Sequence, residues 1–325
     1  MLLFADFDED LIRDHVREYQ AVSGTSGTFS VNCIHKSNDP GREQMVFSLV
    51  HECGGVLILK KDFVAGNPWI EKEFSLFEQL QGHFDSAKDC EVAKPLYLGA
   101  DNSFHITEYS EGRKATDVLR CPQSQAQANQ VFRRCGNWLN HLHQFRPEEP
   151  ENIWTNWIFE EFDKLAVDDG IHAKPEHYTQ FLKQLHSQSG QFQASPCSRV
   201  FSHGDFHSGN VILGKGTVCG LDLAYSSMKP DLYDVVDFLA SDLNNPLPAD
   251  DIGPGGIRQA SVAFFFRTYR RPISRPLLSF HLRARLLLEL VRIQQSAVNR
   301  NPKVKARFEI LLARLSMAFD QPLSG

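Results

Sequence analysis

The sequence predicts an α+β protein with a small, strand-rich N-terminal lobe and a larger, mostly helical C-terminal lobe. Short β-branched and aromatic runs, separated by Gly, Asn, Asp and Pro, dominate residues 22–110. Amphipathic helical patterns dominate after Gly112. With 325 residues the chain is long enough for two lobes. We therefore expect one lobe over 1–110 and a second over 111–325.

The N-terminal lobe begins with helical apolar spacing over residues 8–20. Strand-like runs and one amphipathic run follow in a fixed order. In that order they are "TFSVNCIH", "QMVFSLVH", "GVLILKK", the helical "NPWIEKEFSLFEQLQGHF", "AKPLYLGA" and "SFHITEYS". This order predicts a small antiparallel sheet with one main helix after its third strand.

The C-terminal lobe opens with two amphipathic segments, "QAQANQVFRRCGNWLNHLHQF" and "WTNWIFEEFDKLA". Further on, the apolar runs "VIL" and "VCGLDL" are parted by "GKG", which indicates a hairpin. Beyond residue 230 the pattern is again mostly helical. From Ile257 onward, thirteen Lys or Arg residues face three Asp or Glu. That excess fits a basic helical layer packed on an acidic body, or a surface for an anionic partner.

Composition excludes several classes of protein. No apolar stretch reaches the roughly 18 residues of a membrane span, and the acidic start "MLLFADFDEDLIRD" is unlike a signal peptide. Seven cysteines without a CxxC pair argue against a zinc finger and favour a reducing, cytoplasmic location. The net charge of −6 and the lack of a known module argue against nucleic acid as a partner.

The stretch "FSHGDFHSGN" at 201–210 contains the densest group of candidate catalytic or metal-binding side chains. Asp205 and Asn210 are five residues apart, and Asp222 follows beyond the expected hairpin. Phosphoryl transfer needs a carboxylate that accepts the hydroxyl proton, plus an amide and a second carboxylate that hold Mg²⁺. On a strand, His203, Asp205 and His207 would instead share one face and bind a metal for hydrolysis. A structural polar turn is the third reading.

At these residues the sequence resembles the aminoglycoside phosphotransferase and choline kinase family, which has a two-lobe, protein-kinase-like fold. The family's "HGDxHxxN" loop is matched by residues 203–210, and its strand Asp by Leu221-Asp222-Leu223. The segment "KPDLYDVVDF" resembles the family's later "gdp-x-yD" pattern and aligns Asp234 with its Asp. "NHLHQF" resembles the "LH" that ends an early helix of the large lobe.

The resemblance implies an ATP- and Mg²⁺-dependent phosphotransferase that acts on a small-molecule hydroxyl. Asp205 would be the catalytic base, while Asn210 and Asp222 would bind Mg²⁺. The histidines His203 and His207 would brace the loop, and Asp234 would anchor it structurally. A hydrolase centred on His203, Asp205 and His207, or a non-catalytic nucleotide-binding module, is the alternative.

The small lobe would hold ATP. A triphosphate needs a strand lysine fixed by a helix glutamate, and "GVLILKK" offers Lys60 or Lys61. The resemblance favours Lys60 with Glu73, and Glu71 is the fallback. The remaining ATP contacts would come from Ser26, Gly27 and Thr28 over the phosphates and from the backbone of Glu108 and Ser110 at the adenine.

The acceptor would lie against the helices of the large lobe. "ENIWTNWIFEEFDKLAVDDG" is acidic and contains Trp154 and Trp157. Acids suit a cationic aminoglycoside, and tryptophan faces suit an amino alcohol such as choline. An amphipathic helix with buried tryptophans and a solvated acidic face would have the same sequence. A sugar or a protein hydroxyl also stays open as the acceptor.

Overall fold

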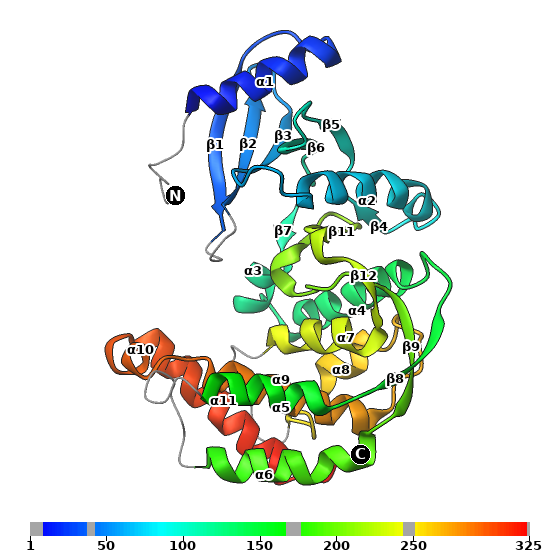
Figure 1. Cartoon of the computed structure of the whole chain (residues 1–325), viewed down its shortest axis with the longest axis vertical. Coiled ribbons are helices and arrows are strands. Elements are labelled where there is room, and N and C mark those ends of the chain that lie inside the picture. Colours follow the sequence, from blue (N-terminus) through cyan, green and yellow to red (C-terminus); the bar gives the residue numbers. More distant parts are fainter. Residues whose placement is uncertain (1–8, 38–42, 167–176, 243–250, 324–325) are drawn as a thin grey trace. The chain divides into compact units, whose positions relative to one another are not determined.

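The computed structural model describes residues 9–37, 43–166, 177–242 and 251–323. The chain divides into two compact units. The N-terminal unit comprises Met1–Gly112 and Gly214–Ala224, and the C-terminal unit comprises Arg113–Leu213 and Tyr225–Gly325. Figure 1 shows the elements of both units in chain order.

The N-terminal unit is built on a five-stranded antiparallel sheet in the order β1-β2-β3-β6-β5. Its strands are β1 (Phe29–Lys36), β2 (Gln44–His51), β3 (Val56–Asp62), β5 (Pro95–Leu98) and β6 (Phe104–Glu108). Helix α1 (Glu9–Ser23) lies across one face (Figure 1) and buries Ile12, Val16 and Tyr19 against Phe47 and Leu59. Residue 8 of the expected first helix lies outside the described residues.

Helix α2 (Trp69–Phe84) packs against the opposite face of this sheet. The side chains of β6 show which helix covers which face of the sheet, because successive side chains of a strand point to opposite faces. The ring of Phe104 stacks on His15 of α1 at 4.1 Å, whereas His105 meets Phe77 of α2 edge-on at 6.0 Å. Both faces of the sheet are therefore covered by helices.

The short strands β4 (Cys90–Val92) and β11 (Val218–Gly220) pair in parallel, and β4 contacts α2.

The C-terminal unit is mostly helical, as expected. Its helices are α3 (Ala115–Arg120), α4 (Gln125–Leu142), α5 (Asn156–Ala166), α6 (Tyr178–Ser189), α7 (Asp231–Leu239), α8 (Gln259–Phe265), α9 (Arg275–Val291), α10 (Gln295–Arg300) and α11 (Pro302–Phe319). Among its described residues, short 3-10 turns lie at Gly190–Phe192, Ser208–Asn210 and Ala240–Asp242. Helix α9 is central, since almost every residue from Leu277 to Val291 is buried.

The same unit also contains strands that the sequence patterns did not reveal. Strands β8 (Glu149–Ile153), β9 (Ser195–Ser202) and β12 (Ser227–Pro230) form an antiparallel sheet in the order β12-β9-β8. Strand β7 (Arg113–Lys114), also not expected, pairs with β10 (Val211–Leu213), which the sequence analysis did expect as the run "VIL". Strand β9 ends at Ser202, so residues 203–207 leave the sheet as a loop. The alternation of His203, Asp205 and His207 on a strand is therefore wrong.

An aromatic cluster forms the core beneath that loop. Trp138 of α4 is fully buried and stacks on Phe206 at 5.3 Å between ring centroids. Phe206 stacks in turn on Phe238 of α7 at 4.9 Å, and Phe238 on Phe265 of α8 at 5.8 Å. One loop side chain, Phe206, thus fixes the loop to α4 and α7 by burying apolar area, and Phe238 extends the cluster to α8.

The expected α+β class, with an antiparallel sheet in the N-terminal region and helices in the C-terminal region, is confirmed. Over the described ranges, no helix combines the length and apolar character needed to cross a membrane.

Replacing Trp138 by alanine should lower the free energy of unfolding by roughly 3–5 kcal/mol, because the change leaves a cavity beside Phe206. Urea titrations followed by circular dichroism measure this loss. Trp154→Ala is the matched control, since Trp154 is 55% exposed, and it should stay within about 0.5 kcal/mol of the wild type. Equal losses in the two variants would contradict the proposed core.

Candidate active site

Strand β3 presents its two lysines to different faces of the sheet. Leu59 packs in the core under α1, so the next residue, Lys60, points towards α2. The Nζ atom of Lys60 lies 2.8 Å from Glu73 Oε2 and 2.7 Å from Asp222 Oδ1. Lys61 instead donates a hydrogen bond to Ser103. The structure therefore brings together Lys60, Glu73 and Asp222, and leaves Lys61 apart.

Burial and neighbouring charges act in opposite directions on the pKa values of Lys60 and Glu73. Burial alone would lower the pKa of Lys60, but the carboxylates of Glu73 and Asp222 outweigh burial and raise it above its ordinary value. Burial alone would likewise raise the pKa of Glu73. The Lys60 ammonium and the His105 ring outweigh that effect and lower the Glu73 pKa to about 2. Both groups are thus charged at neutral pH.

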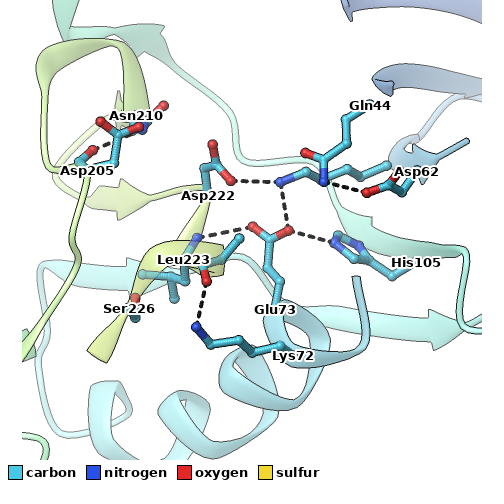
Figure 2. A network of polar contacts seen from close by, with 12 residues as sticks. Gln44, Asp62, Lys72, Glu73, His105, Asp205, Asn210, Asp222, Leu223 and Ser226 are labelled. Carbon is cyan, nitrogen blue, oxygen red and sulfur yellow. Dashed lines mark hydrogen bonds and ion pairs between the residues drawn. The ribbon is translucent and has the colours of Figure 1, made fainter. Parts of the chain in front are cut away.

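Glu73 is the centre of a filled hydrogen-bond network (Figure 2). Its side chain is 2% exposed. Beyond Lys60, Oε2 lies 3.2 Å from His105 Nε2, and Oε1 accepts the backbone N–H of Leu223 at 3.1 Å. His105 had no signal in the sequence, because nothing distinguishes a histidine in a strand pattern from an ordinary core residue.

Helix α2 also fixes the segment that carries Asp222. The Nζ atom of Lys72 donates to Ala224 O at 2.7 Å, next to the contact between Glu73 and Leu223 (Figure 2). Asp222 itself has a φ of +59°, a left-handed conformation that Asp adopts more readily than most residues. The sequence placed Asp222 within a strand, but β11 ends at Gly220, because the left-handed turn cannot continue the ladder.

The predicted phosphate loop is folded against β2. His51 Nε2 lies 2.8 Å from Ser26 O, and the Thr28 hydroxyl donates to Glu52. Gly27 has a φ of +100°, and a β-carbon there would lie 2.7 Å from the His51 ring. Glycine is therefore required at 27, and the Thr28 hydroxyl already has a partner.

The two residues expected at the adenine also have partners within the N-terminal unit. The backbone N–H of Glu108 donates to Lys94 O at 2.9 Å, and its carboxylate pairs with Lys94 Nζ at 2.7 Å. The Ser110 hydroxyl donates to Cys219 Sγ at 3.2 Å. Their part in nucleotide binding stays a prediction.

In the C-terminal unit, Asp205 and Asn210 face each other across one turn (Figure 2). Asn210 Nδ2 donates to Asp205 O at 3.0 Å and to Asp205 Oδ2 at 3.1 Å. His207 Nε2 lies 3.6 Å from the same carboxylate. Burial alone would raise the pKa of Asp205, but the contacts with His207 and Asn210 outweigh it and lower the pKa. Asp205 is therefore an ionised carboxylate.

Asp234 fixes the backbone on which Asp205 stands. Its buried carboxylate accepts the N–H of His203 at 2.7 Å and of Gly204 at 2.9 Å. His143, the last histidine of "NHLHQF", joins this carboxylate at 3.0 Å and the Tyr269 hydroxyl at 2.9 Å. The anchoring contacts are present at Asp234, and the sequence missed the roles of His143 and Tyr269.

The two loop histidines use their rings for local contacts. His203 is fully buried, and its Nδ1 accepts the N–H of Asp205 at 3.3 Å. His207 Nδ1 accepts the N–H of Gly209 at 3.0 Å. Within the part of the chain that the structure describes, no group of three or more His, Cys, Asp or Glu is arranged to hold a metal ion.

Replacing Glu73 by glutamine should make the free energy of unfolding fall less steeply as the solution becomes acidic. The folded pKa of about 2 lies below the ordinary value of 4.5, so this carboxylate stabilises the fold above pH 4.5 and loses that effect as the pH falls towards 2. The effect is on the order of 3 kcal/mol. Urea titrations between pH 5 and pH 3 should show a shallower decline for Glu73→Gln than for the wild type. Glu71→Gln, an exposed neighbour on α2, should decline like the wild type; parallel curves for all three proteins would refute the assignment.

Comparison with known proteins supplies the family. The family described as "Phosphotransferase enzyme family" matches residues 40–271, more than two thirds of the chain. No curated protein sequence matches the chain.

Three solved structures illustrate the shared fold. Amicoumacin kinase, in complex with AMP-PNP, Ca²⁺ and Ami, has a TM-score of 0.61 at 18% identity, covering 98% of this chain and 95% of that one. A choline/ethanolamine kinase family protein from Mesorhizobium loti has a TM-score of 0.57 at 15% identity, covering 96% and 97%. A spectinomycin phosphotransferase has a TM-score of 0.56 at 13% identity, covering 98% and 96%.

The protein-kinase-like fold expected from the sequence is thus confirmed. The chain belongs to the phosphotransferase enzyme family and is an enzyme that transfers a phosphoryl group to an alcohol group of a small molecule.

Proposed function

We propose that this enzyme uses ATP and Mg²⁺ to phosphorylate the hydroxyl of a small molecule. The observation that carries the proposal is the ammonium of Lys60, held by the carboxylates of Glu73 and Asp222. A buried, permanently charged lysine is suited to triphosphate oxygens, and an adjacent carboxylate is suited to a divalent cation. The amicoumacin kinase structure, which contains AMP-PNP and Ca²⁺, supports a nucleotide and a divalent cation as ligands here.

The donor set fits Mg²⁺, which prefers carboxylate and amide oxygens. Asp222 gives one oxygen to Lys60, and its side chain is 34% exposed. Asn210 uses its amide nitrogen on Asp205, which leaves its oxygen for a cation. In this proposal Asn210 and Asp222 would hold the ion, which would supply positive charge against the nucleotide phosphates.

Asp205 is the catalytic base of the proposed reaction. It accepts the proton of the attacking hydroxyl while that oxygen bonds to the γ-phosphorus. The bond to the bridging oxygen breaks, and ADP leaves. The lowered pKa of Asp205 keeps its carboxylate deprotonated, so that it can accept this proton. The contacts of Asp234 with His203 and Gly204 hold the loop backbone in place.

The remaining assignments concern the nucleotide and the acceptor. Ser26, Gly27 and Thr28 would cover the phosphates, which requires Thr28 to exchange Glu52 for a phosphate oxygen. The backbone of Glu108 and Ser110 would meet the adenine. Aminoglycosides, amino alcohols such as choline, and sugars are the acceptor classes to test first, with ATP and GTP as donors.

Two substitutions should separate catalysis from nucleotide binding. Asp205→Asn should lower kcat roughly 10²–10⁴-fold, because the base is lost, and should keep the rise in melting temperature given by MgATP. Asp222→Ala should remove that rise, because its metal and lysine contacts are lost. Coupled-enzyme assays and thermal unfolding measure the two effects, with Asp85→Asn, an exposed carboxylate at the end of α2, as the control.

An Asp205→Asn enzyme with wild-type turnover would rule out the proposed base. A wild-type protein that binds MgATP but phosphorylates no acceptor would favour the non-catalytic module.

A further inference from the structure

The C-terminal unit contains a cavity of about 540 Å³ beside the catalytic loop. That volume lies in the range of small-molecule sites. Its walls come from α5, α7 and α9, with Gly204 and Lys229 at the loop. The lining residues that matter below are Trp157, Glu161, Tyr233, Asp237, His281, Arg285 and Arg292.

The cavity reaches the catalytic loop at the residue that precedes Asp205. Gly204, its neighbour in the chain, is part of the lining. Asp237 is also part of the lining, and its pKa is raised to about 6, chiefly by burial and in part by the nearby charge of Asp205. A hydroxyl bound in this cavity would therefore be near the proposed base.

One side of the cavity is aromatic. Trp157 meets Tyr233 edge-on at 5.6 Å between ring centroids, and both rings lie within 6.4 Å of the His281 ring. Burial lowers the pKa of His281 to about 3, so this ring is neutral at pH 7. Trp157 is 39% exposed and Trp154 is 55% exposed, so the interpretation of both as buried core residues is wrong. The aromatic side is suited to an apolar or aromatic part of a ligand.

Two of the three cations in the lining already have acidic partners. Arg292 lies 3.7 Å from Glu161, and Arg285 lies 3.4 Å from Asp237. Lys229 differs: among the described residues no carboxylate lies within 4 Å of its Nζ, whose one hydrogen bond runs to Tyr225 O at 3.5 Å. Asp234, the third acid of the lining, uses its carboxylate on His143 and on the backbone N–H groups of His203 and Gly204. Lys229 is therefore the cation of the lining that has no acidic partner among the described residues.

The fold holds this ammonium next to the loop. Lys229 lies on β12, where it pairs with Val200 of β9. A β-carbon on Gly204 would come within 2.7 Å of Lys229 Nζ. Glycine at 204 thus leaves the space that the lysine occupies, one residue from Asp205.

We propose that this cavity receives the acceptor alcohol and that Lys229 selects acceptors carrying an anionic group, a carboxylate or a phosphate, beside an apolar or aromatic body. The inference rests on the proposed kinase function and adds the chemical class of its acceptor. An anion near Lys229 gains a charge-assisted contact. A cationic amino alcohol in the same place meets a like charge, which disfavours it.

Three probes with one aromatic body test the charge preference. 3-Phenyllactate is anionic, its methyl ester is neutral and phenylalaninol is cationic, and each carries one hydroxyl or hydroxymethyl group. Isothermal titration of the wild-type protein should give the tightest binding for 3-phenyllactate, by roughly tenfold over phenylalaninol. Glycerol 3-phosphate against glycerate, with glycerol as the neutral reference, then distinguishes a phosphate from a carboxylate as the preferred anion.

Charge reversal identifies the residue responsible. Lys229→Glu should invert the order, so that phenylalaninol binds more tightly than 3-phenyllactate. Lys303→Glu makes the same change at an exposed residue that lines neither described cavity, and it should keep the wild-type order. Trp157→Ala should weaken all three aromatic probes to a similar extent, because it removes the shared aromatic contact. Phosphorylation of the bound probe, with ATP present, should follow the same order.

The outcomes separate this inference from the function on which it rests. Preference of the wild type for phenylalaninol, binding of none of the probes, or an order unchanged by Lys229→Glu would overturn the inference, even if MgATP still raises the melting temperature. Loss of the MgATP effect, with the anion preference intact and inverted by Lys229→Glu, would instead overturn the proposed function and leave an anion-selective cavity.

Discussion

The N-terminal unit depends on one buried cation. The ammonium of Lys60 is held by carboxylates from helix α2 and from the turn after β11, segments that are about 150 residues apart in the sequence. Removing one partner of a buried ion pair leaves a desolvated charge behind, which is more costly than losing the pair together. This constraint explains why Glu73 is also saturated by His105 and by the backbone of Leu223. The network stabilises one arrangement of strand, helix and turn.

In the C-terminal unit a different buried carboxylate, that of Asp234, holds the backbone in place. Asp234 is buried and accepts two backbone N–H groups of the loop, and Phe206 fixes the same loop to the aromatic core. The carboxylate of Asp205, the proposed catalytic base, therefore stands on a backbone that is held at several points. Gly204 then serves two purposes, since its φ of +83° shapes the turn and its missing side chain leaves space for Lys229. A rigid loop with one open side is suited to a reaction with a small, mobile acceptor.

Much of this arrangement could be predicted from the sequence, and the failures have physical reasons. Except for the short strand β4, the order of strands and helices up to Glu108 followed from apolar periodicity. The spacing of Asp205, Asn210 and Asp222 indicated phosphoryl transfer. Periodicity could not choose between Lys60 and Lys61, because helices cover both faces of the sheet and both sides of β3 are apolar. The three-stranded sheet was missed because β8 and β12 are short and polar. Lys229 gave no signal, since its importance comes from the lack of a nearby carboxylate in space.

The central claim is that Glu73 acts on the nucleotide through Lys60. A double-mutant cycle on the dissociation constant of MgATP, using Lys60→Met, Glu73→Gln and the double variant, tests it directly. If Glu73 works by holding the lysine, its replacement should weaken MgATP binding in the wild-type background and have little further effect once Lys60 is gone. Losses that simply add in the double variant would show that the two residues act independently and would contradict the account.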